Sequence, residues 1–200
     1  TRPMQIHLIR HGEVENPSHV VYADIPGFAL SEKGRRQAAA AGRHLADAGI
    51  EMIISSPLDR AVETADLIAS EAGATVVTDP RLTEWGLGVR WRGAAWPELP
   101  RVFPGELEAY LDDPHHLPFC PESIDQVALR ITTAVSDWVG RTTGDLAFVS
   151  HEDPIHATHL SLIGANPAVF HADKPTHSSV TTLRAVDGGW ITESRWAPAQ

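Results

Sequence analysis

Alternating and periodic hydrophobic positions divide most of the chain into short strands and longer helices. Residues 5–10 alternate polar and apolar side chains, which is typical of a strand, and a turn is expected where this segment meets His11-Gly12. Apolar runs indicate further strands, and two of them flank Asp187-Gly188-Gly189, which favours a hairpin. The predicted strands are 5–10, 52–55, 75–78, 146–150, 180–186 and 191–195.

Helices are predicted between these strands from their apolar spacing and from the residues that begin or end them. Ser31 is placed to cap a helix with four consecutive alanines, and Pro57 after two serines is typical of a first helical turn. Asp153 is predicted to cap the helix that begins at Pro154. The predicted helices are about 32–48, 57–71, 123–139 and 154–163, each followed closely by a glycine.

Strands that alternate with helices predict an α/β fold, a three-layer α/β/α sandwich with a mostly parallel central sheet. A chain of 200 residues suits a single domain, which we expect to span residues 1–200. Functional groups of such folds gather beyond the carboxyl ends of the strands. Arg10-His11 and His151 both follow predicted strands, so we expect them to meet at one edge of the sheet.

One segment interrupts the alternation of strands and helices. Residues 85–121 contain six prolines together with Trp85, Trp91 and Trp96, and they show little helical period. We expect this Pro- and Trp-rich segment to be an insertion that covers the site as a lid. Its aromatic side chains are predicted to form a small core of their own.

The charge of the chain excludes some classes of partner. A formal net charge of −10 would repel a nucleic-acid backbone, so no nucleic-acid partner is expected. No apolar run approaches the roughly 20 residues of a membrane-spanning helix, and no export signal is visible, so we expect a soluble protein without a membrane partner. The single cysteine, Cys120, rules out an internal disulfide and fits a reducing compartment, and the predicted location is the cytoplasm.

A series of short motifs carries the candidate chemistry. In chain order they are Leu8-Ile9-Arg10-His11-Gly12-Glu13, Leu30-Ser31-Glu32-Lys33-Gly34, Ser55-Ser56-Pro57-Leu58-Asp59-Arg60-Ala61, Leu82-Thr83-Glu84 and Val149-Ser150-His151. Together they resemble the histidine phosphatase, or phosphoglycerate mutase-like, superfamily, and the resemblance covers nearly the whole chain.

Phosphoryl transfer explains why these residue types are needed. The transferred group spreads negative charge over its oxygens, and guanidinium groups such as those of Arg10 and Arg60 can stabilise it. A neutral histidine can attack phosphorus when its second ring nitrogen is held by an acceptor, which fits His11 on the turn after the first strand. The resemblance implies that His11 is transiently phosphorylated and that His151 stabilises the charge of the transition state.

The leaving group needs a proton, and Glu84 is the candidate general acid. A carboxyl in an apolar setting, here beside Trp85, can have a pKa near the working pH. The same carboxylate can afterwards activate water for attack on the phosphorylated enzyme. We therefore predict five catalytic residues, namely Arg10, His11, Arg60, Glu84 and His151.

Three more residues are expected to contact the substrate. Gly12 lies in the turn formed by Arg10-His11-Gly12 after the first predicted strand, called the signature turn below. Asn16 resembles the family's asparagine that holds the phosphate from the following loop. Glu152 departs from the family, in which small residues commonly follow the second histidine. A carboxylate beside an anion site predicts selection against highly charged substrates, or contact with a positively charged part of one.

The expected function is hydrolysis of a small phosphorylated metabolite through a phosphohistidine intermediate, with no metal and no cofactor. Phosphoglycerate mutase-type transfer is an alternative, disfavoured because such mutases tend to be longer, and a non-catalytic phosphate-binding homologue is another. A zinc site would need histidines four residues apart on one helix, whereas His151 and His156 are five apart with Pro154 between them. The sequence identifies neither the substrate nor the oligomeric state.

Overall fold

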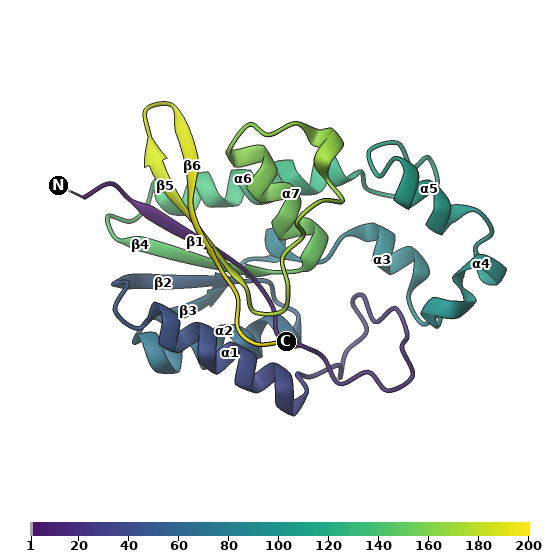
Figure 1. Ribbon diagram of the computed structural model, residues 1–200, viewed down its shortest axis with the longest axis horizontal. Coiled ribbons are helices and arrows are strands. Elements are labelled where there is room, and N and C mark those ends of the chain that lie inside the picture. Colours follow the sequence, from purple (N-terminus) through teal and green to yellow (C-terminus); the bar gives the residue numbers. More distant parts are fainter. Residues whose placement is uncertain (1) are drawn as a thin grey trace.

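A six-stranded mixed sheet forms the middle layer of the protein (Figure 1). The computed structural model describes residues 2–200. Its strands are β1 (Gln5–Arg10), β2 (Ile50–Ser55), β3 (Thr75–Thr78), β4 (Asp145–Ser150), β5 (Val180–Val186) and β6 (Gly189–Trp196). In the order β3-β2-β4-β1-β5-β6, the first four run parallel, and β5 and β6 are each antiparallel to the preceding strand. The predicted strands and the mostly parallel sheet are confirmed.

Hydrophobic side chains on the two faces of the sheet belong to separate clusters. Along β1, Ile6 and Leu8 join one cluster and Ile9 joins the other, as the alternation of a strand requires. β4 is buried along its whole length, which explains its continuous apolar sequence. The helices α1 (Glu32–Leu45) and α2 (Asp59–Ala72) cover one face, and α6 (Ile124–Val139) and α7 (Glu152–Leu162) cover the other (Figure 1). The three-layer arrangement is therefore as predicted.

Two helices begin within one residue of their predicted starts. The backbone N–H of Gly34 donates to the Ser31 hydroxyl at 3.0 Å, so Ser31 caps α1. Ser123 and Gln126 form a reciprocal capping box at the start of α6. α1 ends at Leu45, three residues earlier than predicted.

The starts of the other two large helices were predicted wrongly. α2 begins at Asp59, with Leu58 in the cap position and no side-chain cap. The Ser56 hydroxyl contacts His151 at 2.8 Å and accepts from the Leu58 N–H at 3.3 Å, before the helix begins. α7 begins at Glu152 with His151 in the cap position, so Asp153 lies inside the first turn and is not the cap. Each side chain has a partner distant in sequence that a local pattern does not reveal.

Residues 85–121 are more helical than predicted. They form α3 (Gly86–Trp91), the 3-10 helix η2 (Trp96–Glu98), α4 (Leu99–Val102) and α5 (Glu106–Asp112), which are too short to show a clear period. Trp85 and Trp91 belong to the same cluster as Ile6 and Leu8 of the sheet, so the predicted separate aromatic core is wrong. Figure 1 shows α3 to α5 beyond one end of the sheet.

The register of the sheet decides which loops come together. Arg10 of β1 pairs with Ser150 of β4, and Ser55 of β2 pairs with Val149, so these three parallel strands end side by side. Their next residues are His11, His151 and Ser56. None of the helices in the described part of the chain combines the length and the hydropathy needed to cross a bilayer.

Candidate active site

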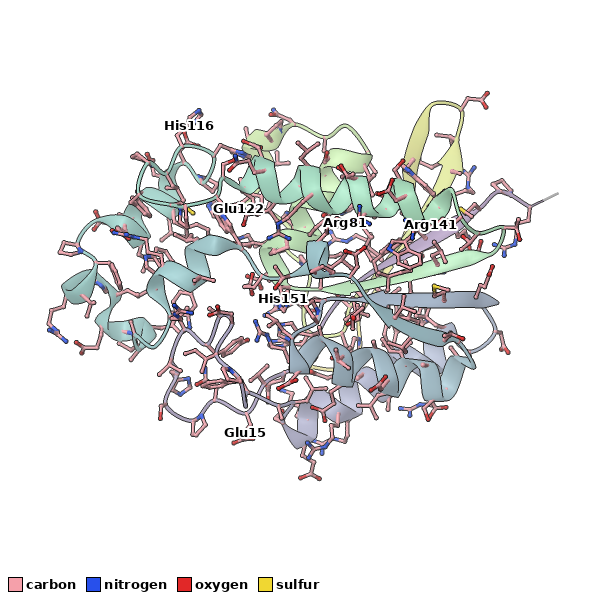
Figure 2. The ribbon with its side chains drawn as sticks, turned by 180° about the vertical axis from the view of Figure 1, so that it is seen from behind. Glu15, Arg81, His116, Glu122, Arg141 and His151 are labelled. Atoms are coloured by element: carbon pink, nitrogen blue, oxygen red, sulfur yellow. The ribbon has the colours of Figure 1, made fainter. Side chains whose placement is uncertain are left out.

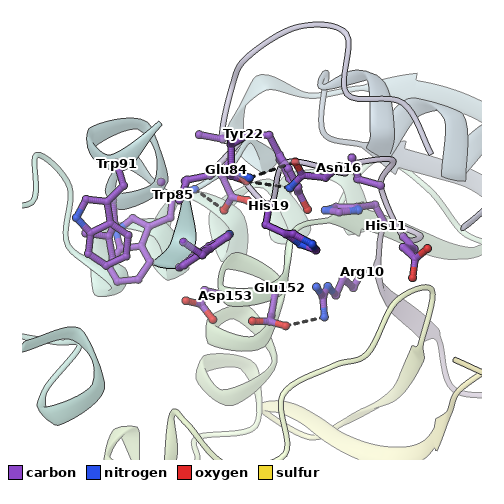
Figure 3. A pocket seen from close by; sticks show the side chains of 18 of the residues that line it. Arg10, His11, Asn16, His19, Tyr22, Glu84, Trp85, Trp91, Glu152 and Asp153 are labelled. Carbon is purple, nitrogen blue, oxygen red and sulfur yellow. Dashed lines mark hydrogen bonds and ion pairs between the residues drawn. The ribbon is translucent and has the colours of Figure 1, made fainter. Parts of the chain in front are cut away.

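The two predicted histidines meet beyond the ends of β1 and β4. The ring centroids of His11 and His151 lie 5.2 Å apart, with the rings inclined at 64°. Figure 2 shows His151 in the middle of the molecule. A pocket of about 610 Å³ opens beside His11, and loop residues 13–23 and residues 84–96 line much of it (Figure 3).

His11 has the hydrogen bonding that a nitrogen nucleophile needs. Its backbone N–H donates to the Ser150 carbonyl at 3.0 Å, which fixes the turn after β1. Its ring Nδ1 lies 2.8 Å from the Gly12 carbonyl, an acceptor, so Nδ1 carries the proton and Nε2 keeps its lone pair. Burial lowers the pKa of His11 well below its ordinary value, and Arg60 and Arg10 lower it further. The ring is therefore neutral at pH 7.

Gly12 holds the signature turn rather than lining the pocket. Its N–H donates to the Thr64 hydroxyl at 3.0 Å, and its carbonyl accepts the proton of His11. A Cβ at this position would lie 2.6 Å from the Gly34 carbonyl oxygen, so glycine is needed where β1 passes the start of α1. Contact between Gly12 and a substrate stays a prediction.

Arg60 reaches the site from the first turn of α2 and is only 2% exposed. It donates to the Ala23 carbonyl at 2.6 Å, and its guanidinium lies 4.6 Å from the centroid of the Tyr22 ring. One guanidinium nitrogen lies 3.6 Å from a Glu84 carboxylate oxygen. These contacts place a buried cation directly behind the pocket.

His151 is completely buried and is oriented by Ser56. Its Nε2 lies 2.8 Å from the Ser56 hydroxyl, while Nδ1 has no hydrogen-bond partner within residues 2–200. The nearest carboxylate oxygen belongs to Glu84 and lies 3.5 Å from Nδ1. Burial lowers the pKa of His151 well below its ordinary value, with Arg60 and His11 adding to the effect. A buried ring nitrogen without a partner is costly, and in the tautomer with the proton on Nδ1 a phosphoryl oxygen would provide the acceptor.

Glu84 has the environment expected of a general acid. Burial raises its pKa, and this effect outweighs the opposing influence of Arg60. The backbone N–H of Trp85 donates to one carboxylate oxygen at 2.8 Å. Arg130 on α6 donates to the backbone carbonyls of Thr83 and Glu84, both at 3.0 Å, and so fixes this segment.

Arg10 is bound by three groups, one on α7 and two in the segment before β5. One terminal nitrogen lies 2.6 Å from the Glu152 carboxylate and 3.0 Å from the Pro175 carbonyl. The other lies 3.0 Å from Nε2 of His177, whose pKa is lowered to about 4 by burial and by Arg10, so this histidine is a neutral acceptor. Figure 3 shows Arg10 and Glu152 facing each other at one side of the pocket.

Asp153 is held by tertiary partners and does not cap α7. Tyr110 donates its hydroxyl to one carboxylate oxygen at 2.6 Å, and Lys174 lies 2.8 Å from the other. The Lys174 ammonium also donates to the Tyr110 hydroxyl at 2.6 Å. Asp153 thus connects the start of α7 to α5 and to the segment before β5.

Asn16 lines the pocket, but its amide is used within its own loop. The side chain donates to the Val20 carbonyl at 2.9 Å and accepts from the Val20 N–H at 3.2 Å (Figure 3). These bonds shape the loop after the signature. Contact between Asn16 and phosphate stays a prediction.

The structure thus brings all five predicted catalytic residues together, with Arg60 and His151 buried behind the pocket. Sequence reasoning missed the residues that orient them, which are Ser56, Thr64, Arg130 and His177. Ser56 belongs to one of the motifs, but its position before Pro57 predicts a helix cap rather than a contact with His151. Nothing in the sequence marks the other three as neighbours of the site.

The histidines of the alternative zinc site are packed into the fold. Nε2 of His159 lies 2.8 Å from the Thr192 hydroxyl, and the ring of His156 packs against Phe170 at 5.5 Å between centroids. Within residues 2–200, no three His, Cys, Asp or Glu side chains gather in a way that could hold a metal ion.

Comparison with known families decides the relationship. A model of the histidine phosphatase superfamily (branch 1) matches residues 6–196. The chain belongs to the histidine phosphatase superfamily. The resemblance inferred from the motifs is therefore confirmed.

Relatives within the histidine phosphatase superfamily include phosphatases and a mutase. An uncharacterized protein of Mycobacterium tuberculosis is 40% identical over 169 residues, which cover 80% of this chain and 79% of that protein. A glucosyl-3-phosphoglycerate phosphatase of Mycolicibacterium vanbaalenii is 33% identical over 164 residues, covering 82% of this chain and 72% of that one. A 2,3-bisphosphoglycerate-dependent phosphoglycerate mutase of Thermoplasma acidophilum is 34% identical over 152 residues, covering 75% and 72%.

Solved structures of the superfamily share the whole fold. The mycobacterial glucosyl-3-phosphoglycerate phosphatase in complex with VO3 has a TM-score of 0.85 and 27% identity, covering 100% of both chains. Superfamily membership and these phosphatase neighbours support a phosphatase.

Proposed function

We propose that the protein hydrolyses phosphomonoesters of small metabolites through a phosphohistidine on His11. The observation that carries the proposal is the state of this ring. It is buried, neutral and held through Nδ1 by the Gly12 carbonyl, which leaves Nε2 as the nucleophile. No metal or cofactor has a role in the proposed reaction.

In the first step, Nε2 of His11 forms a bond to phosphorus while the bond from phosphorus to the ester oxygen breaks. The leaving oxygen takes a proton from Glu84, whose raised pKa keeps part of the population protonated. Arg10 and Arg60 stabilise the charge on the phosphoryl oxygens, and Nδ1 of His151 is placed to donate to one of them.

In the second step, the Glu84 carboxylate removes a proton from a water molecule as the water oxygen attacks phosphorus. The nitrogen–phosphorus bond breaks, and its electron pair returns to Nε2 of His11. Inorganic phosphate is released, and Glu84 is again protonated. The same two residues therefore complete the cycle without another reactant.

Mutase activity is the second candidate, because one relative is a 2,3-bisphosphoglycerate-dependent phosphoglycerate mutase. The carboxylates of Glu152 and Asp153 in the pocket speak against a substrate that carries two phosphates and a carboxylate. The relationship to glucosyl-3-phosphoglycerate phosphatases supports hydrolysis. We also propose the cytoplasm as the location, since the single Cys120 suits a reducing compartment.

Rapid acid and alkaline quenching of the enzyme with a labelled phosphomonoester tests the proposal. We expect an acid-labile, base-stable adduct that is absent in His11→Ala. The control is His116→Ala, which changes an exposed histidine and keeps His11, and it should form the adduct. Undiminished hydrolysis by His11→Ala would overturn the mechanism. Loss of activity in a chelator, restored by zinc, would overturn its metal independence.

The choice between phosphatase and mutase needs a separate assay. The enzyme is given 3-phosphoglycerate with catalytic 2,3-bisphosphoglycerate, and both phosphate release and the 2-phosphoglycerate formed are measured. We expect no efficient isomerisation. Isomerisation without phosphate release would establish the mutase instead.

A further inference from the structure

The pocket extends well beyond the space that a phosphoryl group occupies. Its volume of about 610 Å³ lies within the range of sites that enclose a whole small molecule. Trp85 and Trp91 lie at the side of the pocket away from His11 and Arg10 (Figure 3), and each is only 2% exposed. Trp96 also lines the pocket, is 46% exposed, and lies against Trp91 with ring centroids 6.2 Å apart. An organic group attached to the phosphate therefore faces an aromatic wall.

Positive charge in this pocket is confined to the phosphate end. Among the lining residues of the described chain, Arg10 is the single arginine or lysine, and Arg60 lies directly behind. Five lining residues carry carboxyl groups, namely Glu13, Glu15, Glu84, Glu152 and Asp153. A phosphate dianion would use both arginines, so no arginine or lysine of the lining remains for a second anionic group.

Glu152 differs from its neighbour Asp153 in what it can offer a substrate. Asp153 is 14% exposed and is already paired with Lys174 and Tyr110. Glu152 is 40% exposed, and its paired cation is Arg10 at 2.6 Å. A phosphoryl group that binds Arg10 must displace or share that carboxylate. Glu152 then becomes a hydrogen-bond acceptor beside the ester, with its negative charge no longer fully balanced.

We infer that the substrate is a phosphomonoester whose organic part carries no carboxylate and no second phosphate. Close to the ester it presents a hydroxyl or ammonium group, which donates to Glu152. The remainder of the organic group packs against the aromatic wall. This inference rests on the proposed phosphatase function and specifies its substrate class.

Two pairs of substrates isolate the carboxylate. O-phosphoethanolamine and O-phosphoserine share an ammonium group and differ by one carboxylate. Glycerol 3-phosphate and 3-phosphoglycerate share the hydroxyl group on C2, and they differ in that a hydroxymethyl group of the first is a carboxylate in the second. We expect kcat/KM to be at least about tenfold higher for the carboxylate-free member of each pair, because like charges several ångströms apart repel in a partly buried site. The pair with the larger absolute kcat/KM identifies the donor as ammonium or hydroxyl.

Glu152→Gln tests whether this residue causes the selection. The substitution keeps the size of the side chain and removes its charge, so the tenfold ratios should fall to about threefold or less. The gain should appear mainly as better turnover of O-phosphoserine and 3-phosphoglycerate. Asp187→Asn is the control, since it also removes one negative charge but lies in the exposed β5–β6 turn, and its ratios should equal those of the parent.

The outcomes separate this inference from the proposed function. Equal or better hydrolysis of the carboxylate-bearing members by the parent enzyme overturns the inference and leaves the phosphatase intact. Unchanged ratios in Glu152→Gln overturn the role of Glu152. Failure to hydrolyse these four esters and p-nitrophenyl phosphate alike overturns the phosphatase itself.

Discussion

Replacing Gly34 by alanine tests how tightly the signature turn is held against α1. Gly34 lies in the first turn of this helix, and a Cβ there would come within 2.0 Å of the Glu13 carbonyl oxygen and 2.8 Å of the Glu13 nitrogen. Contacts of a real Cβ essentially never fall below 3.0 Å. The Glu13 backbone, two residues after His11, must therefore move by about 1 Å to accept alanine.

This displacement reverses the usual sign of a glycine-to-alanine change in a helix. Alanine ordinarily stabilises a helix interior by about 0.5–1 kcal/mol, whereas overpacking against backbone costs about 1–3 kcal/mol. We expect a net loss of about 1–2 kcal/mol, equivalent to a fall in Tm of about 2–8 °C for a chain of this size. A shift of about 1 Å near a catalytic group can also reduce turnover about 100-fold.

Thermal and urea unfolding give the stability of Gly34→Ala, and hydrolysis of p-nitrophenyl phosphate gives its kcat/KM. Gly189→Ala is the matched control, because its Cβ would meet nothing within 4 Å and its φ is not positive. That variant should stay within about 0.5 kcal/mol of the parent and keep its activity. If Gly34→Ala proved as stable and as active as the parent, the close approach of Glu13 and α1 would not constrain the site.

Three further variants test individual groups. Glu84→Gln should lower kcat for alkyl phosphates about 10²–10⁴-fold. In pH–rate profiles, the variant should lack the fall in rate that the parent shows as pH rises through the raised pKa of Glu84. The loss of kcat should be smaller for p-nitrophenyl phosphate, whose leaving group needs no proton. Ser56→Ala leaves Nε2 of the buried His151 without its partner. Urea unfolding should therefore show a free energy of unfolding lower by about 1–3 kcal/mol, and kcat should also fall. An unchanged free energy of unfolding and an unchanged kcat would contradict the contact. Burial lowers the pKa of His7 to about 4 in the folded protein. Between about pH 6.5 and 4 the unfolded chain therefore binds more protons at this residue than the folded chain does. The free energy of unfolding should fall on acidification across that window by on the order of 3 kcal/mol. Unfolding measured against pH should show a flatter curve for His7→Gln, and an unaltered curve would exclude this histidine as the source.

Strands and layers could be predicted because each depends on a short pattern. The alternation of β1 and the apolar run of β4 predicted both strands, and the order of strands and helices predicted the sandwich. Ser31 and Ser123 have their capping partners three residues away, so local sequence was sufficient there. The helices of residues 85–121 were missed, since a helix of one or two turns shows too little of the 3.6-residue period.

The remaining helix errors have a shared physical cause. Ser56 and Asp153 are good capping residues by type, but neither is the cap, and each side chain contacts a distant partner. Ser56 contacts His151, 95 residues away, and Asp153 binds Tyr110, 43 residues away. Such competition depends on the register of the sheet and the path of the insertion, which a local pattern does not contain.

By itself, the sequence determined the superfamily and the candidate reactive groups of this protein, because side-chain chemistry and motif order are read directly along the chain. Motif order alone predicts that His11, Arg60, Glu84 and His151 share one site. Only the tertiary structure decided which nitrogen of His11 is free, which group orients His151, and that Arg10 is paired with Glu152. These are properties of atoms brought within hydrogen-bond distance by packing, and a pKa depends on burial and neighbours that exist only in the folded chain.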